Sequence, residues 1–543
     1  MMDDLAAIDV APLAVLLPIL GAALAFVLRR HPLAQRTATI GTLCLTLALE
    51  SWLLVSAWRH GAQAVVIGGW APPFGISMVV DEFSALMLVV STAVSLTVLL
   101  YATGQGMADG DEDGPISVFH PAYLILVAGV SNAFLAGDLF NLYVGFEILL
   151  TASYVLLTLG GTTARIRAGV TYVVVSVVSS ILFLLAIGLV YAATGTVNMA
   201  DLAGKLAEID PGTQQILHVM LLVAFGVKAA VFPLSFWLPD SYPTAPAPVT
   251  AVFAGLLTKV GVYAIIRTET LLFPGGRLNT ALLVVALLTM LVGILGALAQ
   301  ADFKRMLSFT LTSHIGYMMF GVATGSAVAL AATVYYVAHH IIVQTSLFLV
   351  AGLMERRGGT SNVDRLGSLA KLSPVLAVLF FIPAMNLAGI PPFSGFLGKV
   401  GLLRGGVDLG TPLAWVLLAG ALVTSLLTLL AVARVWNRAF WRRAEDAEDA
   451  DPILLIAAEE ARRPATGTTG VKTQPHRLSG RGDAAVLPPT MVFATGVLVA
   501  LGVALTIFAG PLFDLADQAS QQMLERTPYI EAVLGASETG GGR

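Results

Sequence analysis

Residues 225–239 read FGVKAAVFPLSFWLP, an apolar run that carries Lys228 and is interrupted by Pro233. Proline removes a backbone donor and breaks an α-helix. At membrane depth, broken backbone survives only where it is buried in protein or lines a water-filled cavity. A lysine in the bilayer core costs about 3 kcal/mol on insertion scales. The stretch therefore predicts a membrane protein whose interior holds a broken helix and a charged group.

The rest of the chain has the composition of a multi-pass membrane protein. It has 543 residues, of which 57% are hydrophobic and only 12% charged, whereas a soluble domain has about 25% charged residues. Apolar runs of about 20 residues, the length of a transmembrane helix, recur along it. We expect an all-α membrane protein with about fourteen transmembrane helices, at residues 11–28, 38–58, 79–102, 118–136, 138–159, 168–193, 215–239, 244–266, 279–300, 306–323, 326–353, 374–403, 411–437 and 487–510.

A second proline-broken run reads NLAGIPPFSGFLGKVG, with Pro391 and Pro392 in its interior and Lys399 near its end. It lies five spans after the first, so the two runs cross the membrane in opposite directions. Broken helices at matching places are typical of inverted repeats, although two unrelated proline kinks are the alternative. We expect three N-terminal spans and then two inverted five-helix repeats, each with one broken helix, at residues 1–117, 118–266 and 279–437.

The loops indicate which side of the membrane they occupy. Lysine and arginine concentrate in alternate loops, and such loops stay on the cytoplasmic side, which places both termini outside. The acidic start, MMDD, lacks the basic region of a signal peptide, so we expect the first span to be retained. After the second repeat we expect a flexible cytoplasmic insertion, a last helix and an external tail, at residues 438–486, 487–510 and 511–543.

Three lysines and one acid within the spans mark a path for charge: Lys228, Lys259, Lys399 and Glu147. Ionisable residues inside a membrane usually mark ion pathways. A pair of Glu147 and Lys228 predicts a switch, because protonation of one partner biases the other. The alternatives are a static ion pair, an acid that only joins two helices and, for Lys399, a side chain that reaches the membrane interface.

The histidines are a second set of candidates: His314, His339 and His340. Histidine titrates near neutral pH and suits a proton relay, but each is also compatible with a hydrogen-bonded packing role. The adjacent pair faces two sides of a helix, so we expect at most one of the two to line the path.

Several function classes have no sequence support. The chain has no P-loop, no dinucleotide-binding glycine pattern and no nucleophile elbow. Its single cysteine, Cys44, lies in an apolar run, so no disulfide framework is possible. We expect no cofactor and no metal, and no enzyme, so energy must come from an ion gradient or a partner.

Six blocks resemble, in order, the antiporter-like family. This family includes the proton-translocating membrane subunits of respiratory complex I and the large subunits of Mrp-type multisubunit Na⁺/H⁺ antiporters. The third block and the segment ARVWNRAFW look most like the D-type branch of the Mrp antiporters. The blocks are DEFSALMLVVS (81–91), GDLFNLYVGFEILLTASYVLL (137–157), FGVKAAVFPLSFWLPDSYPTAPAPVTAVFAGLLTKVGVYA (225–264), QADFKRMLSFTLTSHIGYM (300–318), HHIIVQTSLFLVAG (339–352) and GIPPFSGFLGKVGLL (389–403).

The resemblance implies a proton path at the membrane midplane, with Glu147 and Lys228 as a pair and Lys259 and Lys399 carrying the proton onward. It also implies the partners: the other subunits of an antiporter complex, protons, a monovalent cation that is Na⁺, and membrane lipids, with no nucleic acid. The expected location is the bacterial plasma membrane.

One position departs from the family, which usually has a lysine where this chain has Gln344. Glutamine does not titrate near neutral pH. His340 lies four residues earlier, on the same helix face, so we expect His340 to carry the proton and Gln344 to hold a connecting water. Two other functions stay open: a proton-pumping subunit of complex I or a related membrane hydrogenase, and a scaffold for a neighbouring subunit.

Overall fold

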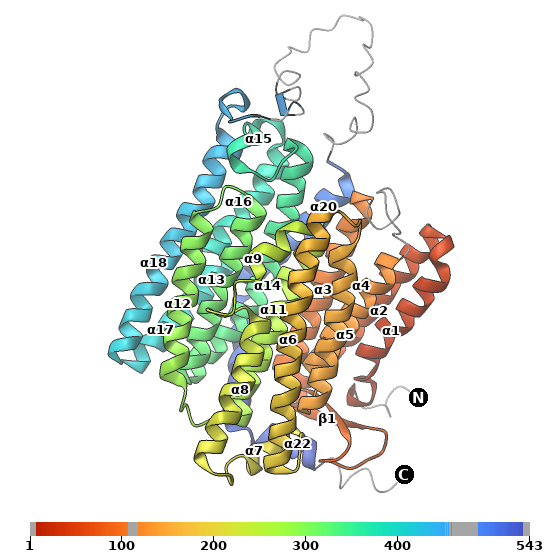
Figure 1. Ribbon diagram of the computed structural model, residues 1–543, viewed down its shortest axis with the longest axis vertical. Helices are drawn as coiled ribbons and strands as arrows, with labels where there is room; N and C mark the ends of the chain where they lie inside the picture. The colour runs from red at the N-terminus through yellow and green to blue at the C-terminus, as the bar shows by residue number, and fades with distance from the viewer. Residues whose placement is uncertain are drawn as a thin grey trace, which may run out of the picture.

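The computed structural model describes residues 7–106, 118–450 and 487–535, and also positions 452, 454, 455 and 458. The described chain is a body of roughly parallel helices (Figure 1). The main helices are α1 (Leu13–Val27), α2 (Pro32–His60), α3 (Glu82–Gln105), α4 (Phe119–Leu135), α5 (Leu139–Thr158), α6 (Thr163–Thr194), α8 (Pro211–Ala229), α10 (Ala247–Val252), α11 (Thr258–Arg267), α12 (Asn279–Leu298), α13 (Phe303–Thr324), α14 (Ala327–Gly358), α16 (Pro374–Ala388), α17 (Ser394–Leu409), α18 (Pro412–Val435) and α20 (Pro489–Ile507).

Besides the 3-10 turns η2 (Leu28–Arg30), η4 (Tyr242–Thr244) and η9 (Ala444–Asp446), short elements precede, connect or follow these helices. They are α7 (Met199–Lys205), α9 (Leu238–Ser241), α15 (Leu369–Leu372), α21 (Ala509–Glu525), α22 (Thr527–Leu534), the 3-10 turns η1 (Ala7–Val10) and η7 (Val363–Arg365), and the π-helical turns η5 (Phe253–Leu257), η6 (Thr268–Leu272) and η8 (Trp436–Trp441).

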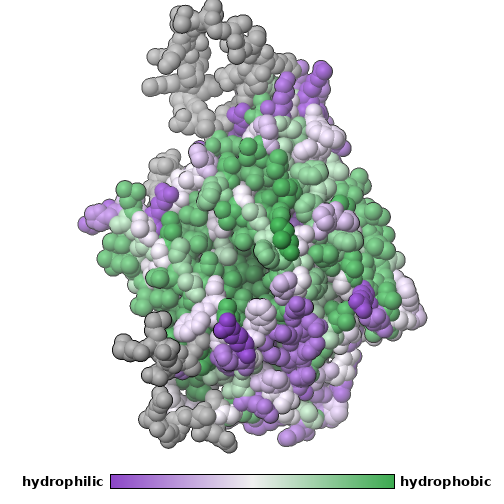
Figure 2. All heavy atoms as spheres, turned by 180° about the vertical axis from the view of Figure 1, so that it is seen from behind, coloured by the Kyte–Doolittle hydropathy of each residue, from purple (hydrophilic) through white to green (hydrophobic). Residues whose placement is uncertain are grey.

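Helices occupy all the ranges predicted as membrane spans. Ten of the described helices are long and apolar enough to cross a membrane, and α4 and α16 are shorter apolar helices. Figure 2 shows a broad apolar surface over the body, with polar residues gathered toward its ends. The fold is thus the predicted all-α membrane architecture, while the number fourteen stays a prediction.

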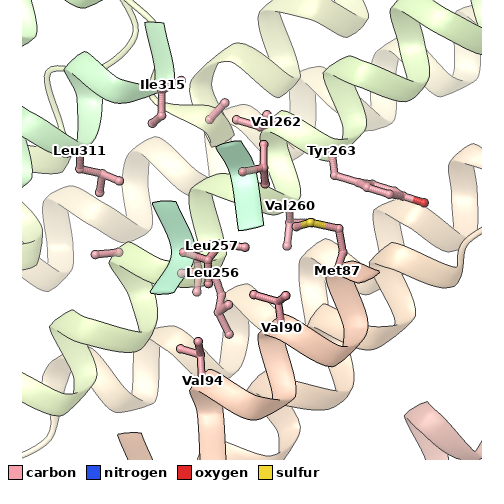
Figure 3. Close-up of a cluster of buried hydrophobic side chains, with 14 of the residues drawn as sticks. Met87, Val90, Val94, Leu256, Leu257, Val260, Val262, Tyr263, Leu311 and Ile315 are labelled. Carbon is pink, nitrogen blue, oxygen red and sulfur yellow. The ribbon is translucent and has the colours of Figure 1, made fainter. Parts of the chain in front are cut away.

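Two central segments are buried along their apolar length: α14, and the continuous helix formed by α10, η5, α11 and η6. Figure 3 shows α3 packed against this continuous helix through side chains that include Met87, Val90, Val94, Leu256, Leu257 and Val260. This apolar layer separates the centre of the molecule from α3, so polar groups at the centre face the other neighbours of α11.

A β-hairpin, which the sequence patterns did not predict, interrupts the otherwise helical part of the chain that the structure describes. Strands β1 (Gln63–Ile67) and β2 (Ile76–Val80) pair antiparallel, with Gln63 opposite Val80. The strands are rich in valine and isoleucine, which favour extended backbone. Gly68 and Gly69, at the end of β1, have positive φ angles that glycine adopts easily.

Two turns with the same design lie at opposite ends of the molecule. Asp138 caps α5 and pairs with Asn198, which caps α7; Asp302 caps α13 and pairs with Asn362, which caps η7. The helix before each asparagine, α6 or α14, ends at a glycine in the left-handed conformation. In Figure 1, α7 lies at the lower end and α15, close after η7, at the upper end. Matching turns at opposite ends are what two inverted repeats require.

The described ends of the chain lie on one side of the body. Both η1 and α22 contact β1. An even number of membrane crossings predicts this arrangement.

The segment after residue 510 is helical rather than a simple tail. Phe513 of α21 stacks on Tyr335 of α14, with ring centroids 4.2 Å apart. Gln522 Nε2 donates to Glu82 Oε1 at the start of α3, 2.6 Å away. Near the end of α20, Thr506 Oγ1 accepts a hydrogen bond from Ser394 N. The helix α21 follows α20 directly and extends along α14 to the start of α3.

Residues 438–450, at the start of the predicted insertion, are held against the rest of the protein. Arg438 forms an ion pair with Asp364, and Arg442 Nη2 donates to the carbonyl groups of Val363, Asp364 and Leu366. These contacts fix residues 438–450 against η7. Most of the remaining insertion, from 451 to 486, lies outside the described residues.

Candidate functional site

Glu147 and Lys228 meet through a hydroxyl group instead of directly. Ser180 Oγ of α6 donates to Glu147 Oε1 of α5, and Lys228 Nζ of α8 donates to Ser180 Oγ over 3.0 Å. Lys228 Nζ also donates to Ser176 O over 3.3 Å and lies 5.6 Å from the ring centre of Phe146. The predicted pair is therefore a three-residue link in which a serine connects acid and base.

Lys228 sits at the first helix break. The helix α8 ends at Ala229, and Ala230 takes the left-handed conformation with φ 57°. Trp237 Nε1 donates to Val227 O over 3.1 Å, satisfying a carbonyl near the helix end. A cavity of about 20 Å³, room for about one water, adjoins Lys228. The break around Pro233 lies where the sequence predicted it and places the lysine beside a small cavity whose wall is mostly apolar.

Lys259 lies at the buried centre of the molecule. Its Nζ donates to Ala254 O over 2.7 Å. Ala254 belongs to η5, and π-helical turns within α-helices are frequent at functional sites. Gly261 lies two residues after Lys259, and a Cβ there would come within 2.6 Å of Ala229 N, so α11 and α8 pack backbone to backbone. The helix that carries Lys228 and the one that carries Lys259 are thus direct neighbours.

The three histidines form a buried cluster with a tyrosine. His314 Nδ1 lies 2.7 Å from Tyr336 Oη, and the rings of His314 and His340 are 5.2 Å apart. His339 Nδ1 lies 2.9 Å from Ser394 Oγ at the second break. The adjacent pair thus points in two directions: His340 toward α13 and His339 toward α17.

His340 and Gln344 both face α13, as their spacing of four residues predicts. Gln344 Nε2 donates to Leu307 O over 2.7 Å. Within the described chain, Gln344 Oε1 and both ring nitrogens of His340 have no hydrogen-bond partner. Buried polar atoms without partners are rare in native proteins. We call the region around these unpaired atoms of His340 and Gln344, between Lys259 and Lys399, the polar gap.

Lys399 is held by neutral acceptors at the second break. Its Nζ donates to Leu387 O and Ala388 O, both 3.1 Å away at the end of α16, and to Ser425 Oγ at 2.9 Å. The last carbonyls of a helix carry partial negative charge, which favours a cation. Pro391 and Pro392 lie in the break between α16 and α17. Lys399 is buried, so it does not reach the membrane interface.

Five residues of the site were not predicted from the sequence: Ser180, Ser394, Ser425, Tyr317 and Tyr336. Tyr317 lies 4.9 Å from Lys399 Nζ and 5.8 Å from the ring of Tyr336, so the two tyrosines join the histidine cluster to Lys399. Serine and tyrosine are frequent in apolar spans, and their sequence context gives no sign of a partner on another helix.

The chain matches a known family over most of this site. The family model described as NADH:quinone oxidoreductase/Mrp antiporter, TM, matches residues 136–428. The D subunit of a Na(+)/H(+) antiporter from Alkalihalophilus pseudofirmus is 38% identical over 96% of this chain and 98% of that protein. Its namesake from Bacillus subtilis is 36% identical with the same coverage.

Solved structures agree with the sequence relatives. A chain of the Mrp complex from Dietzia sp. DQ12-45-1b superposes with a TM-score of 0.85, at 33% identity over 98% of this chain and 100% of that chain. A chain of respiratory complex I from Thermus thermophilus superposes with a TM-score of 0.72, at 26% identity over 95% and 99% of the two chains. The chain therefore belongs to the family of membrane proteins shared by NADH:quinone oxidoreductases and Mrp antiporters, in the branch of the Mrp D subunits.

Proposed function

We propose that this chain carries protons along the membrane midplane as part of a multisubunit Na⁺/H⁺ antiporter in the bacterial plasma membrane. The names of its relatives support exchange of Na⁺ for protons, and the similar chain from Dietzia is part of an Mrp complex. Other subunits of such a complex are its partners, together with membrane lipids. Both termini face outward, and residues 438–486 face the cytoplasm.

The observation that carries the proposal is the link from Glu147 through Ser180 to Lys228. A buried lysine and a carboxyl group that share one hydroxyl have coupled protonation. When a proton reaches Glu147, the charge that stabilises protonated Lys228 is lost, and Lys228 releases its proton. A static pair has no need of the small cavity beside Lys228.

From Lys228 the path continues through Lys259, His340 and Lys399. Lys259 lies on the helix next to α8, and the polar gap around His340 and Gln344 follows. The tyrosine pair then leads to Lys399. Two inverted repeats, residues 118–266 and 279–437, would place the two helix breaks symmetrically along this path, and the matching aspartate–asparagine turns support this arrangement.

Vesicles that contain the assembled complex test the proposal. Lys228→Ala should abolish Na⁺-driven proton movement while the complex still assembles, because the coupled base is lost. Lys371→Ala makes the same chemical change at an exposed lysine of α15 and is the matched control. Near-normal exchange by the assembled Lys228→Ala complex would contradict the proposal and favour a scaffold role.

A proton-pumping component of a redox complex is the other candidate. The likeness to complex I supports it, but identity and TM-score are both higher for the Mrp relative. Purification of the native complex separates the two functions, since an antiporter brings small antiporter subunits and a redox complex brings iron–sulfur subunits.

A further inference from the structure

A buried acid–base pair lies outside the path described so far. His218 Nε2 of α8 and Glu269 Oε1 of η6 are 2.5 Å apart, and their side chains are 3% and 6% exposed. The His218 ring stacks on Phe273, with centroids 4.2 Å apart and planes 9° apart. Burying such a pair has a desolvation cost that packing alone does not require, so its presence calls for an explanation.

The pair stands on the two helices that carry the central lysines. His218 lies ten residues before Lys228 on α8, and Glu269 lies ten residues after Lys259 on the continuous helix of α11 and η6. Ten helical residues span about 15 Å. Because α8 and α11 pack directly, the pair lies beyond both lysines in the same direction. This direction leads to α7 and the hairpin, the end that the charge bias places outside the cell.

A cavity at this end reaches the pair. It has a volume of about 260 Å³, room for several water molecules, and His218 is part of its wall together with Gln214, Phe273, Arg277 and Arg526. The cavity therefore brings one member of a buried acid–base pair into contact with an aqueous space.

The charged groups around the pair are mostly engaged elsewhere. Arg277 Nη1 donates to Pro211 O over 3.0 Å, and Arg526 Nη2 donates to Ala203 O over 2.5 Å. On neighbouring elements, Arg267 pairs with Asp81 at 2.5 Å and Lys205 pairs with Asp201 at 3.0 Å. Arg277 and Arg526 line the cavity wall together with His218, so Glu269 is the acidic partner that His218 itself contacts.

We propose that His218 and Glu269 form the outer proton-exchange site of this protein, connecting the external water to Lys228 and Lys259. His218 accepts a proton from cavity water on one ring nitrogen and releases one from Nε2 to the Glu269 carboxylate; the reverse steps return it. Transfer onward to the lysines takes more than one step and uses intervening water. The inference rests on the proposed function, since it requires that the lysines carry protons.

Inverted vesicles of the assembled complex test it, because their lumen corresponds to the external face. Antiport is measured as a function of lumenal pH at fixed bath pH, and then the reverse. Glu269→Gln and His218→Gln keep the side-chain size and should flatten or displace the lumenal profile while the bath profile is unchanged. The exchanged variant H218E/E269H should restore the lumenal profile. Glu208→Gln makes the same chemical change at an exposed acid of the same end and serves as the control.

The outcomes separate this inference from the proposed function. An active Lys228→Ala complex overturns both. An inactive Lys228→Ala complex with unaltered lumenal profiles in His218→Gln and Glu269→Gln overturns only the outer site. If both variants lose antiport equally in the lumenal and the bath profiles, and the exchanged variant does not restore it, the pair has only a structural role. That result also overturns the outer site. If His218→Gln or Glu269→Gln does not assemble, the exchanged variant H218E/E269H and a labelling experiment test the site instead. Gln214→Cys, in the wall of the cavity, should react with an impermeant maleimide in intact cells. Failure of this cysteine to react would contradict the outer site.

Discussion

Lys228 precedes the first helix break, whereas Lys399 follows the second. Lys228 shares the hydroxyl of Ser180 with a carboxyl group. Lys399 donates to two carbonyls at the end of α16 and to the hydroxyl of Ser425. One lysine is thus coupled to a second titratable group, and the other is held by dipoles that never change their charge.

This difference shows that two regions with similar backbone structure can have different electrostatic roles. The aspartate–asparagine turns at the two ends match bond for bond, yet the charged groups at the two breaks do not. A base coupled to an acid responds to the protonation of its neighbour. A base held by fixed dipoles responds only to the arrival of a proton. We infer that the first break sets when protons move and that the second receives them.

The largest difference between the two breaks is expected when Lys228 and Lys399 are each replaced by alanine. Lys228→Ala leaves the Glu147 carboxylate without its base, and an uncompensated charge in the protein interior is destabilising. Lys399→Ala leaves only neutral acceptors. Both variants should lose antiport, but only Lys228→Ala should also lower the thermal stability of the purified complex, and Glu147→Ala in that background should recover it. Equal destabilisation by Lys399→Ala would show that the two sites are electrostatically alike.

The next largest loss of antiport is expected from a substitution in the polar gap between the two breaks. His340→Ala should lose most of the antiport, because it removes the titratable group nearest the gap. Gln344→Lys in that background should restore part of it, since the Gln344 side chain already reaches Leu307 O. His31→Ala, at an exposed histidine, is the control. Full activity of assembled His340→Ala would move the path to His314 or His339.

The helix breaks and the ionisable residues were predictable because their signals are local. Pro233 interrupts an apolar run in any context, and an ionisable side chain such as Lys259 stands out among apolar neighbours. The serine that joins Glu147 to Lys228 had no such signal, because Ser180 lies 33 residues from one partner and 48 from the other.

Two parts of the fold were also not predicted, one because its strands are short and one because its packing partner lies elsewhere in the sequence. The strands of the hairpin are five residues each and lie between two much longer apolar runs. The helix α21 is amphipathic, and its apolar side is covered by α14, a partner that composition does not reveal. Length and hydropathy predict spans well, but they do not predict which helix covers which.

Removing the linking hydroxyl should reduce the activity without abolishing it. Ser180→Ala deletes a hydrogen bond at each end of the link, and hydrogen bonds to charged groups contribute about 1.5–3 kcal/mol. Antiport should therefore fall on the order of tenfold, measured as the initial rate in vesicles. Ser179→Ala is the control, since that neighbouring hydroxyl donates to Ala224 O instead. An unchanged rate in Ser180→Ala would mean that water replaces the hydroxyl.

The matching change at the second break should have the smallest effect. Ser425→Ala removes one of three acceptors from Lys399, but Leu387 O and Ala388 O stay in place at the end of α16. The partial negative charge of that helix end still favours the cation, and the ring of Tyr317 still lies 4.9 Å from Nζ. The initial rate should fall less than in Ser180→Ala, because two of the three acceptors of Lys399 stay in place. A loss as large as that of Ser180→Ala would mean that a hydroxyl, and not the helix end, governs Lys399, and the two breaks would then work by one principle.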